Sequence, residues 1–571
     1  MAIGVYVNTF THGFVLDDDV VFLKNSHVQE GVSAIPKIVT HGFLYGFNQK
    51  NDQSYRPFVL INFAIEKSVF GNNPKVLHGL NAFYYGILAC LLFWFLHVLF
   101  KRKKPWLVFW ISLLFVLHPI HTEVVANIKG RDEIFHAIFL ILSFIFALKY
   151  IDSPKIKNVF ISLITYFIAL LCKEMAVTYI ALLPLTIWMF RSVKIKKLSI
   201  FTIYFIGVLC FYFILRNAIL DTVTFEESMS VMNNGLAAAT NYPDQLATNF
   251  SIFGNYIKLL FFPHPLTWDY SFPHFPIQSF TNPIVILIVV VLIILTVLSI
   301  RGLRSKNKLA YCFLFFIISF SIVSNFFILI GATLGERFLF FPSIAFCIFL
   351  VLLLEKIIRL LKLKKDTAVL TTLVLSVAVL YAFKTIDRNK DWVNNEQLFI
   401  SGAVATPNNS RAVLALGSIY RERAERSNTQ QEQINNYLKA IEQYNKSIVL
   451  YPKNTEAHYN LGVIYMNTNQ NDKAKEAFKA AVSIDSNYIS ALNNLGFIAI
   501  RESNYSEAER MFLRCLEINE SFQDAHANLG VVYHNIGSRQ KAEEYYKSAL
   551  ALDPNDVTTK TNLKLLIGPA D

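Results

Sequence analysis

Long apolar stretches alternate with short polar segments through the first 385 residues of the chain. A helix needs about 20 apolar residues to cross a bilayer, and ten stretches reach or approach that length, two of them short. They cover residues 77–100, 105–126, 132–151, 158–172, 175–190, 198–216, 283–300, 309–330, 338–355 and 367–384. This pattern predicts an all-α, multi-pass transmembrane domain over residues 1–385.

Two parts of this pattern need interpretation. Cys172-Lys173-Glu174 separates the fourth stretch from the fifth, so residues 158–190 form either two short helices or a partly re-entrant hairpin. We favour two helices, because the next basic loop then lies on the same side as the other basic loops.

Residues 1–76 contain no span, and Met1–Phe10 is apolar over only half the needed length. We therefore expect a further helix before residue 1.

A different pattern begins near residue 411, where similar segments recur every 34 residues. That spacing is typical of tetratricopeptide repeats, which stack pairs of helices into an α-solenoid. An earlier copy ends at Gly417 and carries an insertion of about 11 residues before the next one. We expect about four repeats over residues 411–571, a capping helix from about Asp556, and a linker over residues 386–410. The regular copies are Ala457-His-Tyr-Asn-Leu-Gly462, Ala491-Leu-Asn-Asn-Leu-Gly496 and Ala525-His-Ala-Asn-Leu-Gly530.

Charge supports the membrane interpretation. The formal net charge is +12, and the basic excess lies in the apolar part of the chain, so topology explains it and no nucleic-acid partner is predicted. The basic groups fall at alternate ends of successive apolar stretches, which the positive-inside rule places in the cytoplasm. The unusual polar motifs fall at the opposite ends, together with the repeats. The basic groups are residues 101–104, 149–157, 191–197, 301–308 and 356–365.

The polar motifs supply the candidate chemistry. Asp17 and Asp18 are adjacent acids near a membrane surface, and each raises the pKa of the other, so one could act as a general base near neutral pH. Arg56, in Tyr55-Arg56-Pro57, could grip a lipid phosphate as a permanent, bidentate cation. The alternatives are a solvated loop cap for the acids and ordinary headgroup contact for the arginine.

Further polar residues interrupt or border the apolar stretches, where ionisable groups are costly and are by default functional or mutually paired. His118 and His121 have the i,i+3 spacing of metal ligands, but no third ligand is evident, so we favour hydrogen bonds to sugar hydroxyls or to the acidic cluster. Glu336 and Arg337 could form an internal pair. The remaining candidates for binding or supporting a substrate are Glu123, Arg131, Lys173, Glu174 and Asp269.

The motifs resemble, in order, those of the TMTC family of protein O-mannosyltransferases. They are Phe14-Val-Leu-Asp17-Asp18, Tyr55-Arg56-Pro57, His118-Pro119-Ile-His121-Thr-Glu123, Gly130-Arg131, Lys173-Glu174, Asp269-Tyr270-Ser271 and Glu336-Arg337-Phe-Leu-Phe-Phe-Pro342, followed by the repeats. The resemblance implies a GT-C-type membrane glycosyltransferase that uses a polyprenyl-phosphate sugar. It implies that Asp17 and Asp18 provide the catalytic base, and the chemistry of Arg56 and Arg337 suits the donor phosphate.

We therefore expect transfer of a hexose, with mannose implied by the resemblance, to Ser or Thr hydroxyls of exported proteins, with inversion. No cofactor is required beyond the lipid-linked donor, and a divalent cation is compatible with the sequence. Two alternatives stay open: a related enzyme that glycosylates a lipid or a surface polysaccharide, and a non-catalytic membrane scaffold that displays the repeats. The repeats themselves could dock a polypeptide substrate or an assembly partner. Composition suggests a bacterial plasma membrane with a periplasmic active face; in a eukaryote the site would be the endoplasmic reticulum membrane.

Overall fold

The computed structural model describes residues 1–50, 53–220, 229–362 and 366–568. These residues contain helices and turns but no strand, which confirms the predicted all-α class. The chain divides into two compact units, Met1–Thr406 and Pro407–Asp571. Residues 386–410, expected to be a linker, contain the end of α16 (Asp366–Asn389), a 3-10 turn η10 (Lys390–Trp392) and α17 (Asn395–Ala405).

Five helices in the described part of the first unit are long and apolar enough to cross a membrane. They include α5 (Pro74–Leu99), α8 (Arg131–Asp152), α11 (Ile195–Leu220), α13 (Pro283–Arg304) and most of α16. A sixth would be α6 (Pro105–Leu117) continued by the short helices of Pro119–Ala126, with a bend of 51° between the two parts. A multi-pass membrane protein is therefore indicated, although fewer helices meet the length requirement than the ten stretches suggested.

The remaining predicted stretches are helical but shorter. They form α9 (Ile156–Cys172), η6 (Glu174–Thr178) with α10 (Tyr179–Phe190), α14 (Lys308–Phe320) and α15 (Ser343–Leu360). The break between α9 and η6 lies at Lys173, as the sequence predicted. An eleventh long helix, α12 (Tyr242–Phe261), was not predicted, because polar residues such as Asn249 interrupt its apolar pattern.

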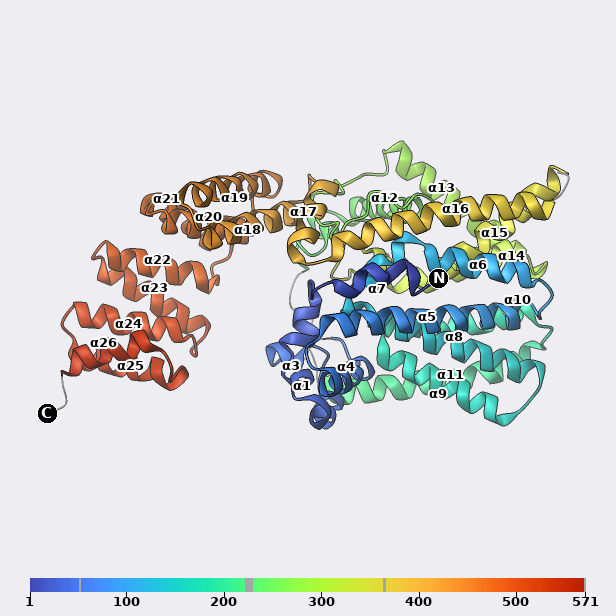
Figure 1. Cartoon of the computed structure of the whole chain (residues 1–571), viewed down its shortest axis with the longest axis horizontal. Coiled ribbons are helices and arrows are strands. Elements are labelled where there is room, and N and C mark those ends of the chain that lie inside the picture. Colours follow the sequence, from blue (N-terminus) through green and yellow to red (C-terminus); the bar gives the residue numbers. More distant parts are fainter. Residues whose placement is uncertain (51–52, 221–228, 363–365, 569–571) are drawn as a thin grey trace. The chain divides into compact units, whose positions relative to one another are not determined.

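Short helices gather at one end of the bundle. η1 (Gly4–Thr11) packs on α5 and α16, where Tyr6 and Tyr85 meet edge to face at 5.5 Å. After the π-turn η2 (Asp19–Leu23) come α1 (Ser26–Gln29), η3 (Gly31–Ala34), α2 (Ile35–Val39), α3 (Tyr45–Asn48) and α4 (Pro57–Phe70). In Figure 1, α1, α3 and α4 lie together at one end of α5 and α8. This end carries the polar motifs.

The basic connections meet at the other end (Figure 1). Lys104 binds Glu355 at 2.7 Å, which joins the start of α6 to the end of α15. Arg191 binds Asp152 at 2.7 Å and the Val98 carbonyl at 2.8 Å, and Lys306 donates to the Arg191 carbonyl at 2.9 Å. The structure therefore confirms that the basic groups and the polar motifs occupy opposite ends of the bundle.

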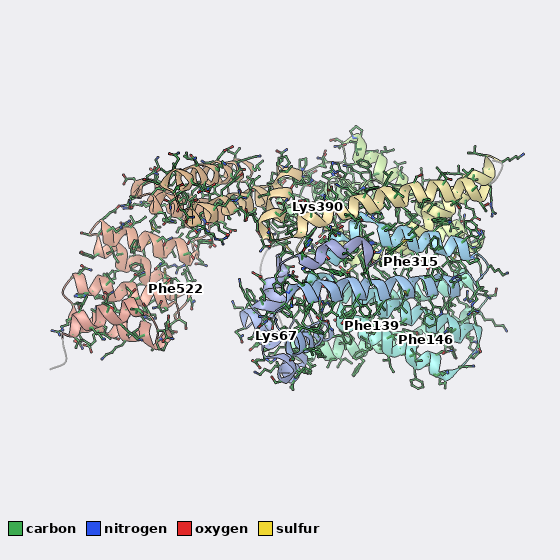
Figure 2. All side chains as sticks on the ribbon, in the orientation of Figure 1. Lys67, Phe139, Phe146, Phe315, Lys390 and Phe522 are labelled. Atoms are coloured by element: carbon green, nitrogen blue, oxygen red, sulfur yellow. The ribbon has the colours of Figure 1, made fainter. Side chains whose placement is uncertain are left out.

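The labelled side chains of the first unit lie in two places. Figure 2 shows Phe139, Phe146 and Phe315 along the helical bundle, whereas Lys67 of α4 and Lys390 of η10 lie at the end with the short helices.

The second unit is a stack of helical hairpins, as the 34-residue period predicted. Each hairpin pairs an inner helix with an outer one, and the long insertion of the first repeat lengthens its outer helix, α19, to 21 residues against 14 for the next outer helix. The inner helices are α18 (Ser410–Arg426), α20 (Thr455–Asn467), α22 (Ile489–Arg501) and α24 (Gln523–Asn535), with the capping helix α26 (Val557–Ile567). The outer helices are α19 (Gln430–Leu450), α21 (Asn471–Ile484), α23 (Tyr505–Ile518) and α25 (Arg539–Leu552).

A glycine in each inner helix permits this packing. A Cβ added at Gly496 would lie 2.6 Å from the Phe512 ring of the paired helix, closer than carbon atoms approach. Gly417, Gly462 and Gly530 face aromatic rings in the same way in the other repeats. In each repeat, therefore, an aromatic ring packs directly against the backbone of the inner helix.

Candidate functional site

The predicted acidic motif places two carboxylates in different surroundings. Asp18 is completely buried, and its Oδ2 accepts from the Val15 N–H at 3.1 Å while its Oδ1 accepts from the Lys129 N–H at 2.7 Å. The side chain of Asp17 is 61% exposed. Asp18 therefore ties the acidic loop to the start of α8, whereas Asp17 is the carboxylate that a substrate can reach.

Burial changes the proton affinity of the inner acid. Desolvation raises the pKa of Asp18 to about 7, and the neighbouring Asp17 adds to the increase, while the two backbone hydrogen bonds oppose it. The paired acids thus have unequal environments, which the sequence did not predict, and the pKa of the buried one is shifted toward neutrality.

Lys129 lies beside the exposed carboxylate. Its ammonium is 3.8 Å from Asp17 Oδ2 and also 3.8 Å from Asp132 Oδ2, and its side chain is 14% exposed. Both separations exceed hydrogen-bond length, so the attraction is electrostatic and the ammonium keeps donors for a third group. Because the backbone of the same residue binds Asp18, one residue fixes the position of both acids.

Asp132 is the centre of a buried charge network. Its Oδ2 receives Arg56 Nη1 at 2.8 Å and Lys173 Nζ at 3.2 Å, in addition to the longer contact with Lys129. The carboxylate is only 1% exposed, and a buried negative charge is costly without partners, so these cations stabilise its ionised form. Lys173 also donates to Glu133 at 2.6 Å.

Arg56 is held by carboxylates on both sides. Its Nε and Nη2 donate to Glu174 Oε2 at 3.1 and 2.9 Å, opposite the contact with Asp132. Burial alone would lower the pKa of Arg56, but Glu174 and Asp132 raise it, so the guanidinium is charged. The structure therefore brings Arg56, Lys173 and Glu174 together as the sequence analysis grouped them, in a largely internal arrangement.

Arg337 binds Glu123 rather than its neighbour Glu336. Its backbone N–H donates to Glu123 Oε2 at 2.9 Å and its Nη1 binds the other carboxylate oxygen, which corrects the alternative of an internal pair. Burial lowers the pKa of Arg337, whereas the negative charges of Glu123 and Asp17 raise it. The net effect is a raised pKa, so the guanidinium is charged. The side chain is 30% exposed. Arg337 and Lys129 are thus two partly exposed cations within electrostatic reach of Asp17.

Glu336 belongs to a second buried cluster. Its Oε1 accepts from the Thr267 N–H at 2.8 Å and from the Tyr270 hydroxyl at 3.0 Å, and Arg388 Nη2 lies 3.7 Å away. Burial, with a contribution from Glu123, raises the pKa of Glu336 to about 7 against the effect of Arg388. Asp269 accepts from the Ser271 hydroxyl at 2.9 Å in the adjoining loop. This cluster fixes the loop before α15.

Four predicted residues lie inside the protein with their polar atoms engaged. Arg131 is fully buried and bonded to Asn81 at 2.7 Å and to Glu66, and the Tyr55 hydroxyl donates to the Val39 carbonyl at 2.9 Å. His118 contacts the Leu260 carbonyl at 3.0 Å and accepts from the Ile120 N–H, whereas His121 contacts Tyr85 and Ser343, each at 2.9 Å. We therefore assign a structural role to each of these four side chains.

The expected hydrogen bonds from the two histidines to the acidic cluster are therefore wrong. Among the residues that the structure describes, no group of three or more His, Cys, Asp and Glu side chains is arranged to hold a metal ion.

Three residues of the network were not predicted from the sequence. They are Lys129, Asp132 and Glu133, which lie in the segment Lys129-Gly-Arg-Asp-Glu133. Only Arg131 of this segment was predicted as a site residue. Arg131 is internal, whereas these three neighbours belong to the charge network. Their signal was present, because two acids at the start of an apolar span require cationic partners. His136, one turn further along α8, is buried with both ring nitrogens unbonded to described residues and offered no such signal.

Comparisons with known proteins identify relatives for both parts of the chain. The middle tetratricopeptide-like domain of cilia and flagella-associated protein 70 matches residues 425–552. The protein O-mannosyl-transferase TMTC3 of Mus musculus is 26% identical over 84% of this chain and 53% of its own length, and TMTC1 of Homo sapiens is 24% identical over 80% of this chain and 55% of its own. The chain spans about half the length of these curated relatives.

The crystal structure of MamA covers 31% of this chain at 24% identity, with a TM-score of 0.25. The family model matches within the repeat part, and the sequence matches to the mannosyl-transferases extend through most of the membrane part as well. Over most of its length, therefore, the chain is a homologue of the TMTC protein O-mannosyl-transferases.

Proposed function

We propose that the protein transfers a hexose, mannose by analogy with its relatives, from a polyprenyl-phosphate donor to Ser or Thr hydroxyls of polypeptides. The observation that carries this proposal is the exposed carboxylate of Asp17 beside the two partly exposed cations Lys129 and Arg337 at one end of an apolar bundle. A glycosyl transfer to a hydroxyl needs a proton acceptor and a means to stabilise a departing phosphate. The names of the relatives support the same reaction.

In the proposed step, Asp17 removes the proton of the acceptor hydroxyl while its oxygen attacks the anomeric carbon. The bond between that carbon and the phosphate oxygen breaks, and polyprenyl phosphate leaves with the bonding electron pair. Attack opposite the leaving group inverts the configuration. Asp18 acts as a positioning residue, because both of its oxygens are occupied by backbone N–H groups.

Lys129 and Arg337 would stabilise the charge of the leaving phosphate. Arg56, to which the sequence analysis gave this role, supports the site indirectly, because its guanidinium is engaged by Glu174 and Asp132. The donor is the only co-substrate needed, and a divalent ion stays compatible with the chemistry.

We also propose an orientation and an acceptor. The basic end of the bundle faces the cytoplasm, so the site opens to the periplasm of a bacterium or to the lumen of the endoplasmic reticulum. The second unit would then bind polypeptide on the active side. A lipid or polysaccharide acceptor is the alternative, and it predicts that residues 407–571 are dispensable for transfer in detergent.

The test is transfer by the purified full chain, with radiolabelled mannosyl polyprenyl phosphate and Ser/Thr peptides. General-base catalysis contributes about 10²- to 10⁴-fold, so Asp17→Asn should lower kcat by that range. Lys129→Met should lower it by about 10²-fold through the lost stabilisation of the leaving group. Asp19→Asn, on an acid that pairs only with Lys24 among the described residues, is the control and should keep wild-type activity. Full activity of Asp17→Asn would refute the assignment of the base.

A non-catalytic scaffold is the remaining alternative. It predicts no transfer by any variant, and an unchanged cellular phenotype of Asp17→Asn.

A further inference from the structure

The exposed acid follows a residue with an unusual backbone conformation. Asp17 lies in the loop of residues 12–18, which joins η1 to η2, and Leu16 in this loop has a φ of 49°. This left-handed conformation is sterically costly for a residue with a bulky side chain, and it persists only where the surrounding structure enforces it. The direction in which the Asp17 side chain leaves the loop therefore depends on the groups that hold Leu16.

A distant asparagine holds Leu16. The Leu16 N–H donates to Oδ1 of Asn395, the first residue of α17, at 2.8 Å, although the two residues lie 379 positions apart in the sequence. The side chain of Leu16 packs against a buried cluster that includes Trp392 of η10 and Leu398 of α17. Both the backbone and the side chain of Leu16 are thus held by the segment that follows α16.

The same segment contacts the N-terminal residues at two further points. The Gly13 N–H donates to the Val393 carbonyl at 2.9 Å, and Asn389 Nδ2 donates to the Val5 carbonyl at 2.8 Å. These two contacts locate the chain where it enters the loop. The hydrogen bond of Asn395, by contrast, is made to the residue directly before the acid.

We propose that Asn395 is a positioning residue for Asp17: its hydrogen bond maintains the left-handed conformation of Leu16 and so directs the carboxylate toward Lys129. Asp17 Oδ2 lies 3.8 Å from Lys129 Nζ in this arrangement. A rotation about the backbone bonds of Leu16 would move the whole carboxylate, whereas Asp18 is held separately by its own two hydrogen bonds. The consequence for transfer rests on the proposed function, in which Asp17 is the base.

Placement of the base matters because proton transfer requires it within hydrogen-bond reach of the acceptor hydroxyl. The loss of one hydrogen bond of ordinary strength corresponds to about tenfold in rate, so Asn395→Ala should lower kcat by about that factor. In an Asp17→Asn background the same substitution should have no further effect, because the group that it displaces is already inactive. A tenfold loss in both backgrounds would show a general effect on the fold and would overturn the proposal.

The adjacent asparagine provides a matched control. Asn394 caps α17, because its Oδ1 accepts from the Gln397 N–H at 2.8 Å. Asn394→Ala therefore removes the same kind of side chain and one hydrogen bond from the same turn, which costs stability, but it leaves the contact with Leu16 in place. This variant should keep the wild-type kcat, and a loss equal to that of Asn395→Ala would contradict the proposal.

A second readout does not use transfer at all. With a water-soluble carbodiimide, a carboxylic acid adds to the reagent, and a neighbouring amine then displaces the urea to form an amide. Peptide mass spectrometry of the full chain in detergent measures the yield of the amide between Asp17 and Lys129. The exposed pair Glu30 and Lys37, 2.7 Å apart, gives the reference yield in the same sample.

Asn395→Ala should lower the ratio of these two yields, and Asn395→Asp, which keeps an acceptor oxygen at the same place, should restore it. Asn395→Gln covers the case in which Asn395→Ala does not fold, because it keeps the carboxamide but displaces the oxygen by one methylene, and it should lower the ratio as well. An unchanged ratio would overturn the positioning role whatever the transfer assay shows. A lowered ratio together with full activity of Asp17→Asn would support the positioning role and refute only the assignment of the base.

Discussion

Asp18 shows how one buried residue links the site to the stability of the first unit. Its pKa is about 7 in the folded protein and 3.8 in the reference state. Between pH 4 and 7 the folded state keeps a proton that the unfolded state has lost, so this group lowers the free energy of unfolding as pH rises. The decrease reaches up to about 4 kcal/mol and levels off above pH 7.

Asp18→Asn should therefore flatten the pH dependence of stability. The melting temperature of the wild type should fall more between pH 4.5 and 7 than that of the variant, because the amide cannot ionise. Thermal unfolding in detergent across this range measures the difference, with Asp19→Asn as the control. Parallel curves for the wild type and Asp18→Asn would contradict the raised pKa.

At the scale of the element, each inner helix of the second unit depends on a glycine. In Gly496→Ala the new methyl group would collide with the Phe512 ring, and neither buried helix can move away without losing contacts. Overpacking of this kind costs about 1–3 kcal/mol. Chemical denaturation monitored by circular dichroism should show that loss for Gly496→Ala. Ser490→Ala, an exposed substitution in the same helix, should show no loss, and an equal effect of the two would indicate that the helix pair adjusts freely.

Helix positions were predictable because both apolar runs and the 34-residue repeat are local signals. The helix α12 was missed because its contacts, not its composition, bury it. The charge network was partly predictable for the same reason. Arg56, Lys173 and Glu174 are conspicuous in apolar surroundings. Asp132 carries the same signal, but its central position in the network follows only from the fold, which brings three distant segments together. Likewise, Arg337 could not be assigned to Glu123 rather than Glu336 without the fold.

At the scale of the whole molecule, the separation of basic and polar ends predicts a membrane orientation. Lys103 lies among the basic connections and Asn48 lies at the polar end, and both are exposed. A membrane-impermeant maleimide applied to intact cells or spheroplasts should label Asn48→Cys, whereas Lys103→Cys should react only after permeabilisation. Parent protein with its native cysteines provides the background. The reverse labelling pattern would place the candidate site in the cytoplasm.

Lys129 contributes to the site through two kinds of atom: its backbone N–H binds Asp18 Oδ1 at 2.7 Å, and its ammonium lies 3.8 Å from Asp17 Oδ2. Every amino acid except proline carries the backbone N–H, so a substitution of the side chain removes the cation and leaves the contact with Asp18 in place. A survey of side-chain substitutions would therefore record only the charge of this residue. Its hold on the buried acid would be detected only by a change to the main chain, such as replacement of the amide by an ester.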